Sequence, residues 1–222
     1  MLYRVLAVVI GYCFGLFQTA SLLGRRKGID IRREGSGNAG TTNALRTMGV
    51  RAGLIVMAGD ILKCILAVLT VWLLAGRAHP EIDYLLRVWT GLGCIAGHNY
   101  PFYMGFRGGK GMACTAGLIN SISLVLTGLG LALFFGLLAL THYVSLCSLS
   151  VGVMFFIGTV VMGQTGHFHM AQPQLTEMYI VTAVIVAEMF FRHRENIKRL
   201  LRGTERKTYI LKGAKNKCER LQ

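Results

Sequence analysis

The 222-residue sequence has little charge, little proline and no segment that would divide it. Only 15% of its residues are charged and 3 are proline, whereas 53% are hydrophobic and the mean hydropathy is +0.51. It contains no Ser/Pro-rich linker, low-complexity tract or fixed-period repeat, so we expect one domain over residues 1–222. Scarce charge together with apolar runs of about 20 residues excludes an ordinary soluble core. The composition therefore predicts an all-α, polytopic integral membrane bundle.

The sequence also lacks paired cysteines. None of its 6 cysteines belongs to a Cys-x-x-Cys pair, and most lie within apolar runs. Free cysteine in such runs behaves as a small buried apolar residue. We therefore expect neither disulfides nor a zinc site, and no metal or cofactor.

Acidic residues are scarce as well, and the basic residues are clustered. The chain has 10 Asp and Glu against 24 Lys and Arg, and 20 of those 24 fall within residues 25–51, 107–110 and 192–220. These stretches flank apolar runs, so the positive-inside rule explains them better than nucleic-acid binding does. We expect all three on the cytoplasmic face, including a basic tail from about residue 192, and the charge-balanced link 76–87 outside.

Apolar runs predict the membrane segments. They cover about residues 2–23, 52–75, 85–103, 112–140, 144–162 and 175–191. An even number of crossings must separate the central and C-terminal basic stretches. The run 112–140 is too long for one upright helix, so we expect it to break at Gly128 and Gly130. This gives seven transmembrane segments with the N-terminus outside; the alternative is one re-entrant segment and five full spans.

The strongest functional signal is Gly-Ser-Gly-Asn-Ala-Gly-Thr-Thr-Asn-Ala-Leu-Arg at residues 35–46. Glycines let backbone N–H groups turn inward, and short polar side chains and Arg46 complete a nest suited to phosphate. The same letters match the Gly-x-Gly-x-x-Gly dinucleotide fingerprint. We reject that interpretation because a membrane helix, not a strand, precedes these glycines.

Two further polar stretches fall on the same predicted face. Residues 97–111 read Gly-His-Asn-Tyr-Pro and then Phe-Arg-Gly-Gly-Lys-Gly, which is no Walker A loop because Gly111 replaces the magnesium-binding Ser or Thr. Lys110 favours anion binding there over a simple interhelical turn. In residues 192–205, His193 and Asn196 share a face if the helix continues, although such a basic segment also suits a membrane-surface anchor.

Asp60 and Lys63 lie three residues apart within an apolar run, so they can pair on one helix. Ionisable residues inside a membrane are functional candidates. An ion pair that braces the bundle explains them equally well, and both interpretations stay open.

With these motifs the chain resembles the bacterial membrane family of acyl-phosphate:glycerol-3-phosphate acyltransferases, the PlsY family. The first motif starts at Ser21-x-x-Gly24-Arg25 and continues through residues 35–46, and the other two are the stretches within 97–111 and 192–205. The resemblance covers nearly the whole chain. It implies acyl transfer from acyl phosphate to the 1-hydroxyl of sn-glycerol 3-phosphate, which gives lysophosphatidic acid and phosphate and begins phospholipid synthesis. It also implies a bacterial cell membrane location, with the active site on the cytoplasmic face.

The resemblance implies roles for particular residues. The loop 36–43 would hold the phosphate of acyl phosphate, Arg46 and Lys110 would grip glycerol 3-phosphate, and His193 and Asn196 would orient the attacking hydroxyl. Whether His193 or a substrate phosphate oxygen takes the proton stays open. These four are the expected catalytic residues: His193, Asn196, Lys110 and Arg46. The expected substrate-binding residues are Ser21, Arg25, Ser36, Gly37, Asn38, Gly40, Thr41, Thr42, Asn43, His98, Gly108, Gly109, Gly111, Ser145 and Ser148.

A soluble enzyme that makes acyl phosphate is an expected docking partner for the basic face, and nucleic acid is not an expected partner. The sequence disfavours acyltransferases that use acyl-CoA or acyl carrier protein through a His-x4-Asp motif, since no histidine here has an aspartate five residues later. The remaining alternative is a membrane transporter or binding protein for a phosphorylated solute. It would need inverted repeats and polar sites near mid-membrane, and neither is visible.

Overall fold

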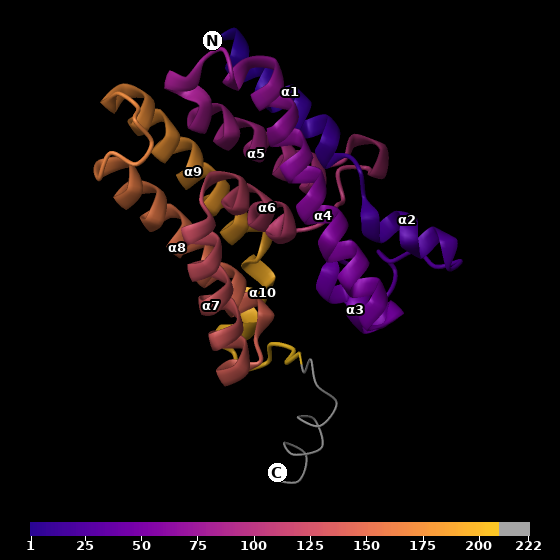
Figure 1. The fold of residues 1–222 in the computed structure, drawn as a ribbon. Helices are drawn as coiled ribbons and strands as arrows, with labels where there is room; N and C mark the ends of the chain where they lie inside the picture. Colours follow the sequence, from indigo (N-terminus) through magenta and orange to yellow (C-terminus); the bar gives the residue numbers. More distant parts are fainter. Residues whose placement is uncertain (209–222) are drawn as a thin grey trace.

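The computed structural model describes residues 1–208, which form a bundle of α-helices with no β-strand in that range (Figure 1). The helices are α1 (Leu2–Gly15), α2 (Thr19–Arg26), α3 (Thr41–Met48), α4 (Val50–Val71), α5 (Asp83–Asn99), α6 (Met112–Ile122), α7 (Leu124–Thr141), α8 (Val144–Gln164), α9 (Gln172–Arg192) and α10 (Arg194–Leu201). A π-helical turn, Trp72–Gly76, extends α4, and 3-10 turns form at Pro80–Ile82 and Phe102–Met104. The predicted all-α architecture is confirmed.

One end of the bundle gathers the link after α4 and the loop between α8 and α9. Arg4 of α1 pairs with Glu177 of α9 at 2.5 Å, and the Tyr84 ring lies 4.8 Å from that of Phe168. Near the same end, Arg87 of α5 donates to a carbonyl at the end of α6. These contacts place the link 76–87 at the end opposite to the three polar motifs.

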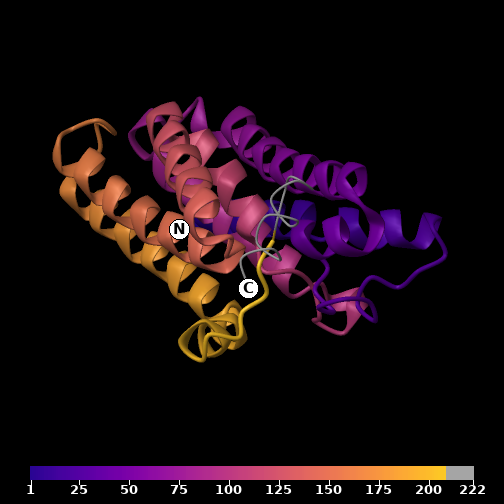
Figure 2. The same ribbon diagram turned by 90° about the horizontal axis from the view of Figure 1, so that it is seen from below.

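The three polar motifs meet at the other end. Ser145 at the start of α8 donates to Glu205 at 3.0 Å, and Arg46 of α3 donates to Thr208 at 2.7 Å. Viewed from this end, the segment after α10 runs from the α8–α9 side toward α3 (Figure 2). Helices α1, α4, α5, α6, α7, α8 and α9 therefore alternate in direction between the two ends. The part of the predicted basic tail beyond Thr208 lies outside the described residues.

Within residues 1–208, five helical segments are long and apolar enough to cross a membrane. They are Leu2–Arg26, Val50–Gly76, Leu124–Thr141, Val144–Gln164 and Gln172–Arg192. Many of their outward apolar side chains are half exposed, as expected for a lipid-facing surface. The other two of the seven predicted segments are α5, with 17 residues, and α6, with 11, and neither is among these five. The count of seven therefore stays a prediction beside the alternative of five full spans.

The break in the run 112–140 was predicted at the wrong place. It falls at Ser123, whereas Gly128 and Gly130 lie inside α7. Ser123 has an extended backbone, and its hydroxyl accepts a hydrogen bond from the amide of Leu126 at 3.3 Å. A serine N-cap stabilises a new helix start, while a glycine inside a helix costs only about 1 kcal/mol. The cap therefore decides the position of the break.

Helices α1 and α5 pack with their backbones in contact. A Cβ added to Gly11 would lie 2.1 Å from the Thr90 carbonyl oxygen, and one added to Gly97 would lie 2.3 Å from that of Tyr12. Small residues at such positions let membrane helices approach closely. This contact sets the end of α5, and thus the second motif, beside the interruption between α1 and α2.

We expect cysteine labelling from opposite sides of the membrane to separate the two ends. Lys27→Cys, Arg107→Cys and Arg202→Cys should share one accessible side, and Glu81→Cys should react from the other. All four positions are exposed, and the contacts above place the first three at the motif end. The measurement is reaction with a membrane-impermeant maleimide in right-side-out and inverted vesicles.

The background for this labelling should replace Cys13 and Cys218 and retain the four buried cysteines. Reaction of Arg107→Cys and Glu81→Cys from the same side would contradict the topology.

Candidate active site

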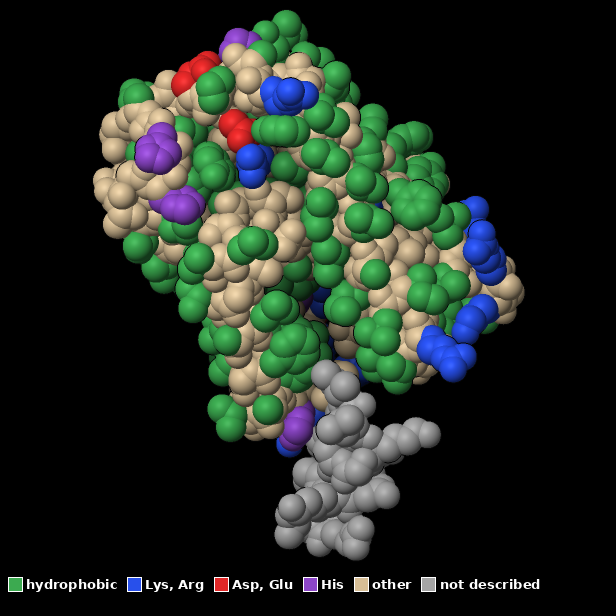
Figure 3. Space-filling model, viewed as in Figure 1, with side chains coloured by type: hydrophobic (Ala, Val, Ile, Leu, Met, Phe, Trp, Pro, Cys, Tyr) green, Lys and Arg blue, Asp and Glu red, His purple; other side chains and the backbone are tan. Residues whose placement is uncertain are grey.

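A cavity of about 960 Å3 lies at the motif end of the bundle. Its lining comes from the first-motif loop, α3 and α4, from the second motif and α6, from α7 and α8, and from residues 192–206. Figure 3 shows the hollow between α7 and the α3–α4 side, with basic side chains inside it. All three motifs therefore contribute to one cavity.

Positive charge dominates the polar part of this cavity. Among the described residues, its lining includes nine Lys or Arg against four Asp or Glu. The basic residues are Arg32, Arg33, Arg46, Arg107, Lys110, Arg192, Arg194, Arg199 and Arg206. Such a concentration of cations at low dielectric attracts anions strongly.

Asn43 organises the first-motif loop. Its side-chain amide donates to the carbonyls of Ile31 and Glu34, each at 3.0 Å, and its Oδ1 accepts from the amide of Ser36 at 2.9 Å. The side chain is 1% exposed. Although Asn43 borders the cavity, these contacts use its polar groups to shape the loop. The structure therefore gives Asn43 a structural role in the loop, and its expected substrate contact stays a prediction.

The rest of the first-motif loop faces the cavity. Gly37 has φ of +71°, which favours glycine and turns the chain. The Thr41 hydroxyl is buried and has no hydrogen-bond partner among residues 1–208. The cavity lining also includes Ser36, Gly37, Asn38, Gly40, Thr41 and Thr42.

The glycine pair of the second motif forms a tight turn. The amide of Gly108 donates to the Asn99 carbonyl and that of Gly109 to the His98 carbonyl, both at 3.0 Å. Arg192 donates to the Gly109 carbonyl at 2.6 Å. These amides are therefore not available to a ligand, and Gly109 does not line the cavity. A tight turn between helices therefore explains the adjacent glycines Gly108 and Gly109. Of the residues in this stretch, Gly108, Lys110 and Gly111 line the cavity.

Lys110 and Asn196 meet within the cavity wall. The Lys110 ammonium donates to Asn196 Oδ1, and Asn196 Nδ2 donates to Glu205 at 2.6 Å. Burial lowers the pKa of Lys110 to about 8, and the arginines nearby act in the same direction. The lysine is therefore a cation at neutral pH that loses its charge in mildly alkaline solution.

Glu205 is a site residue that the sequence analysis did not identify. Its carboxylate accepts from Asn196, from Ser145 at 3.0 Å and from Arg199 at 2.7 Å. Burial raises its pKa, but these hydrogen bonds outweigh burial and the net pKa is lowered. The sequence indicated Glu205 only through its place in the third motif. Its hydrogen-bond partners come from separate helices, α8 and α10, so the sequence does not show that they meet.

His193 lies between α9 and α10 and is 4% exposed. Its Nδ1 is 2.8 Å from the Met189 carbonyl oxygen, which can only accept, so Nδ1 carries the hydrogen. Burial, reinforced by the charge of Lys110, lowers the pKa of His193 to about 4. The ring is thus neutral at pH 7, with Nε2 available as an acceptor, and both His193 and Asn196 line the cavity.

The remaining expected residues fall into two groups. Arg46, His98, Ser145 and Ser148 line the cavity, although Ser148 donates to the carbonyl one turn earlier in α8.

Ser21 and Arg25 instead line a second pocket of about 400 Å3 with Asp30, Arg32 and Met104. In this structure Ser21 and Arg25 are therefore outside the main cavity, beside residues Asp30 and Arg32 that line both pockets, and their role in substrate binding stays a prediction. The reason for their position is the interruption after α1, which turns α2 away from the bundle.

The chain is similar to known proteins over nearly its whole length. The family model described as glycerol-3-phosphate acyltransferase matches residues 5–203. A glycerol-3-phosphate acyltransferase of Clostridioides difficile is 40% identical over 206 residues, which covers 91% of this chain and 94% of that protein.

Crystal structures of PlsY, an integral membrane glycerol 3-phosphate acyltransferase, have the same fold. The glycerol 3-phosphate form aligns with a TM-score of 0.80 and 31% identity, covering 93% of this chain and 96% of that one. The lysophosphatidic acid form aligns with a TM-score of 0.78, 30% identity and coverages of 93% and 95%.

We expect Asn43→Ala to loosen the first-motif loop. The substitution leaves two carbonyls and one amide without partners, and each buried unpaired group costs about 1–3 kcal/mol. Hydrogen–deuterium exchange of residues 31–43 should become roughly ten- to a hundredfold faster. The control is Thr47→Val in the same helix, which removes a single side-chain hydrogen bond. Equal exchange in both variants would contradict the structural role of Asn43.

Proposed function

The chain belongs to the glycerol-3-phosphate acyltransferase family, and we propose that it acylates the 1-hydroxyl of sn-glycerol 3-phosphate with acyl phosphate as the donor. The products are lysophosphatidic acid and inorganic phosphate. The observation that carries this proposal is a single cavity whose lining is cationic near the three motifs and apolar between α6, α7 and α8. A substrate with a phosphate head and a fatty acyl chain matches this lining, because it is anionic at one end and apolar at the other.

The apolar part of the cavity suits the acyl chain. It is lined by Ala116 and Ile119 of α6, by Leu131 and Phe135 of α7, and by Val151 of α8. The side chains of α7 in this set are also 54% and 53% exposed on the lipid-facing surface. An acyl chain can therefore enter from the bilayer and transfer its apolar surface from lipid to protein at little cost.

The cationic part suits two phosphorylated substrates. Both substrates are anions that repel each other, so bringing them together requires positive charge and oriented donors. We assign glycerol 3-phosphate to Arg46 and Lys110, which both line the cavity and are close enough for the charge of Arg46 to affect that of Lys110. We assign the phosphate of the donor to the first-motif loop, where Ser36 and Thr41 line the cavity and the enclosed Thr41 hydroxyl has no hydrogen-bond partner among residues 1–208.

The reaction needs little acid catalysis because acyl phosphate is a mixed anhydride with a good leaving group. The substrate hydroxyl oxygen attacks the acyl carbonyl carbon, a carbon–oxygen ester bond forms, and the bond from that carbon to the phosphate oxygen breaks. His193 Nε2 accepts a hydrogen bond from the attacking hydroxyl, and Asn196 orients the same group. With its pKa near 4, His193 is a weak base, so a phosphate oxygen of the substrate is the better final proton acceptor.

This enzyme is an integral, multi-pass membrane protein, and we place its active site on the cytoplasmic face of a bacterial cell membrane. The support is the basic charge gathered at the motif end, which the positive-inside rule assigns to the cytoplasm. We also propose that a soluble enzyme that produces acyl phosphate delivers the substrate at this face, because direct transfer protects a labile anhydride from water. A solute transporter is disfavoured by a cavity that gathers its polar motifs at one end of the bundle.

The choice of donor is the primary test. Purified protein in lipid nanodiscs should form lysophosphatidic acid from glycerol 3-phosphate and acyl phosphate, measured by mass spectrometry. Acyl-CoA and acyl carrier protein thioesters should give no product above background, because the chain has no His-x4-Asp motif. Equal rates with acyl-CoA would overturn the proposed donor while leaving the acyltransferase family intact.

Lys110 should supply a charge to substrate phosphate. A charge-assisted contact is typically worth about 1.5–3 kcal/mol, so Lys110→Ala should lower kcat/KM for glycerol 3-phosphate roughly ten- to a hundredfold. Because burial lowers the Lys110 pKa to about 8, the charged form is present below that pH. In the wild type, kcat/KM should therefore fall as the pH rises through about 8.

Lys110→Arg should move this alkaline decline to higher pH, because guanidinium does not deprotonate there, and should recover only part of the rate. Lys198→Ala is the matched control, since Lys198 is exposed, pairs with Glu195 and lies outside the cavity. An unchanged alkaline decline in Lys110→Arg would remove this lysine as its cause.

A further inference from the structure

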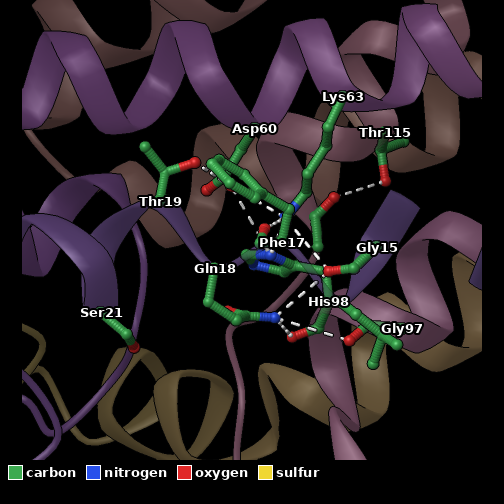
Figure 4. A network of polar contacts seen from close by, with 12 residues as sticks. Gly15, Phe17, Gln18, Thr19, Ser21, Asp60, Lys63, Gly97, His98 and Thr115 are labelled. Atoms are coloured by element: carbon green, nitrogen blue, oxygen red, sulfur yellow. Dashed lines mark hydrogen bonds and ion pairs between the residues drawn. The ribbon is translucent and has the colours of Figure 1, made fainter. Parts of the chain in front are cut away.

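A buried lysine lies beneath the cationic part of the cavity, at the interruption between α1 and α2. Lys63 of α4 is 4% exposed. Its ammonium contacts the Phe17 carbonyl oxygen at 2.7 Å, His98 Nδ1 at 2.8 Å and Asp60 Oδ1 at 2.9 Å. Figure 4 shows Lys63 reaching from α4 into this cluster, with His98 directly below it.

The contact with His98 determines which ring nitrogen carries hydrogen. An ammonium group has only N–H donors and no lone pair, so Lys63 donates at each of its contacts, which also include a longer one of 3.4 Å to the Gly15 carbonyl oxygen. His98 Nδ1 must therefore accept, so it carries no hydrogen. The His98 ring is the neutral tautomer with its hydrogen on Nε2.

His98 is a lining residue of the cavity, and its Nε2–H group lies beside Gly109, the neighbour of the cavity-lining residues Gly108 and Lys110. His98 lines the cavity although it is 3% exposed, and its Nε2 is so close to Gly109 that a Cβ there would lie 1.9 Å away. Among residues 1–208, Nε2 has no hydrogen-bond partner. It is also not one of the unpaired polar atoms that the surrounding protein encloses completely. It is a donor without a protein acceptor, beside the loop that carries Lys110.

We propose that Lys63 is a positioning residue that holds His98 as the Nε2–H tautomer, and that His98 donates this hydrogen to a substrate phosphate oxygen. This inference rests on the proposed acyl transfer for the identity of the substrate. It also gives the two cavity histidines opposite roles. His193 keeps its hydrogen on Nδ1 and offers an acceptor, whereas His98 offers a donor.

Asp60 completes the arrangement. Its Oδ1 also accepts from Thr19 at 3.2 Å and lies 3.8 Å from His98 Nδ1. It compensates the charge of Lys63, which would otherwise be buried without a counter-ion. If the ammonium is removed, the same carboxylate faces Nδ1 directly and favours a hydrogen on that nitrogen. Loss of Lys63 thus changes the His98 tautomer rather than only removing a brace.

Nitrogen NMR of full-length protein with 15N-labelled histidine in nanodiscs tests the tautomer. His98 resonances are assigned by their absence in His98→Gln or, if that variant does not insert, in His98→Asn. The wild type should show His98 with unprotonated Nδ1 and protonated Nε2. Lys63→Met should show protonated Nδ1. A wild-type His98 that carries its hydrogen on Nδ1 overturns the proposal, whether or not Lys63→Met inserts.

Kinetics separate positioning from bracing. Lys63→Met should raise the KM of the substrate whose phosphate His98 contacts about tenfold, so KM is measured for glycerol 3-phosphate and for acyl phosphate separately. Thr19→Val is the matched control, because Thr19 contacts the same Asp60 oxygen but not His98. It should keep the wild-type tautomer and both KM values. A Lys63→Met protein with unchanged tautomer and KM but lower thermal stability would leave Lys63 a brace and overturn the proposal.

The proposed function can fail independently. Wild-type protein that shows the expected tautomer but transfers no acyl group from acyl phosphate would count against the donor assignment alone.

Discussion

Repulsion among cations beside a bilayer is the constraint on which the rest of this structure depends. Nine basic side chains line one cavity, and lipid offers them no solvation. The fold offsets this with backbone carbonyls and a few carboxylates. Arg192 binds the carbonyl of Gly109, Lys63 binds that of Phe17, and Glu205 accepts from Arg199. The cations that remain without a strong counter-ion are those that can bind anionic substrates.

Interruptions of the helices provide most of these carbonyls and turns. The chain leaves helical geometry after α1, in the second motif, at Ser123 and at His193, and of these the second motif and His193 line the cavity. Backbone that is not helical at membrane depth must be covered by protein or line a cavity. Here the interruption after α1 is covered by Lys63 and by Gln18, which donates to the His98 carbonyl at 3.0 Å. The side chains that satisfy these backbone groups therefore also set the geometry of the site.

The two histidines of the cavity illustrate how position determines chemistry. Each is buried and each has one nitrogen committed to the protein, but His193 donates to a carbonyl whereas His98 accepts from an ammonium. Because the two partners are of opposite kinds, the second nitrogen is an acceptor on His193 and a donor on His98. A hydroxyl that must lose a proton and a phosphate that needs hydrogen bonds require these two different groups.

The sequence by itself determined the membrane class, the apolar runs that form the long helices and the three motifs, because hydropathy, charge asymmetry and short-range spacing are local properties of a chain. It also placed Asp60 and Lys63 on one helix, where they pair at 2.9 Å. Only the tertiary structure decided that Asn43 shapes the loop, that Glu205 joins the site and that Lys63 meets His98. Those contacts link residues brought together by packing between separate segments, and the packing depends on helix interruptions and close backbone approach. Hydropathy and motif spacing do not encode which segments meet, so the polar contacts between separate segments followed from the fold alone.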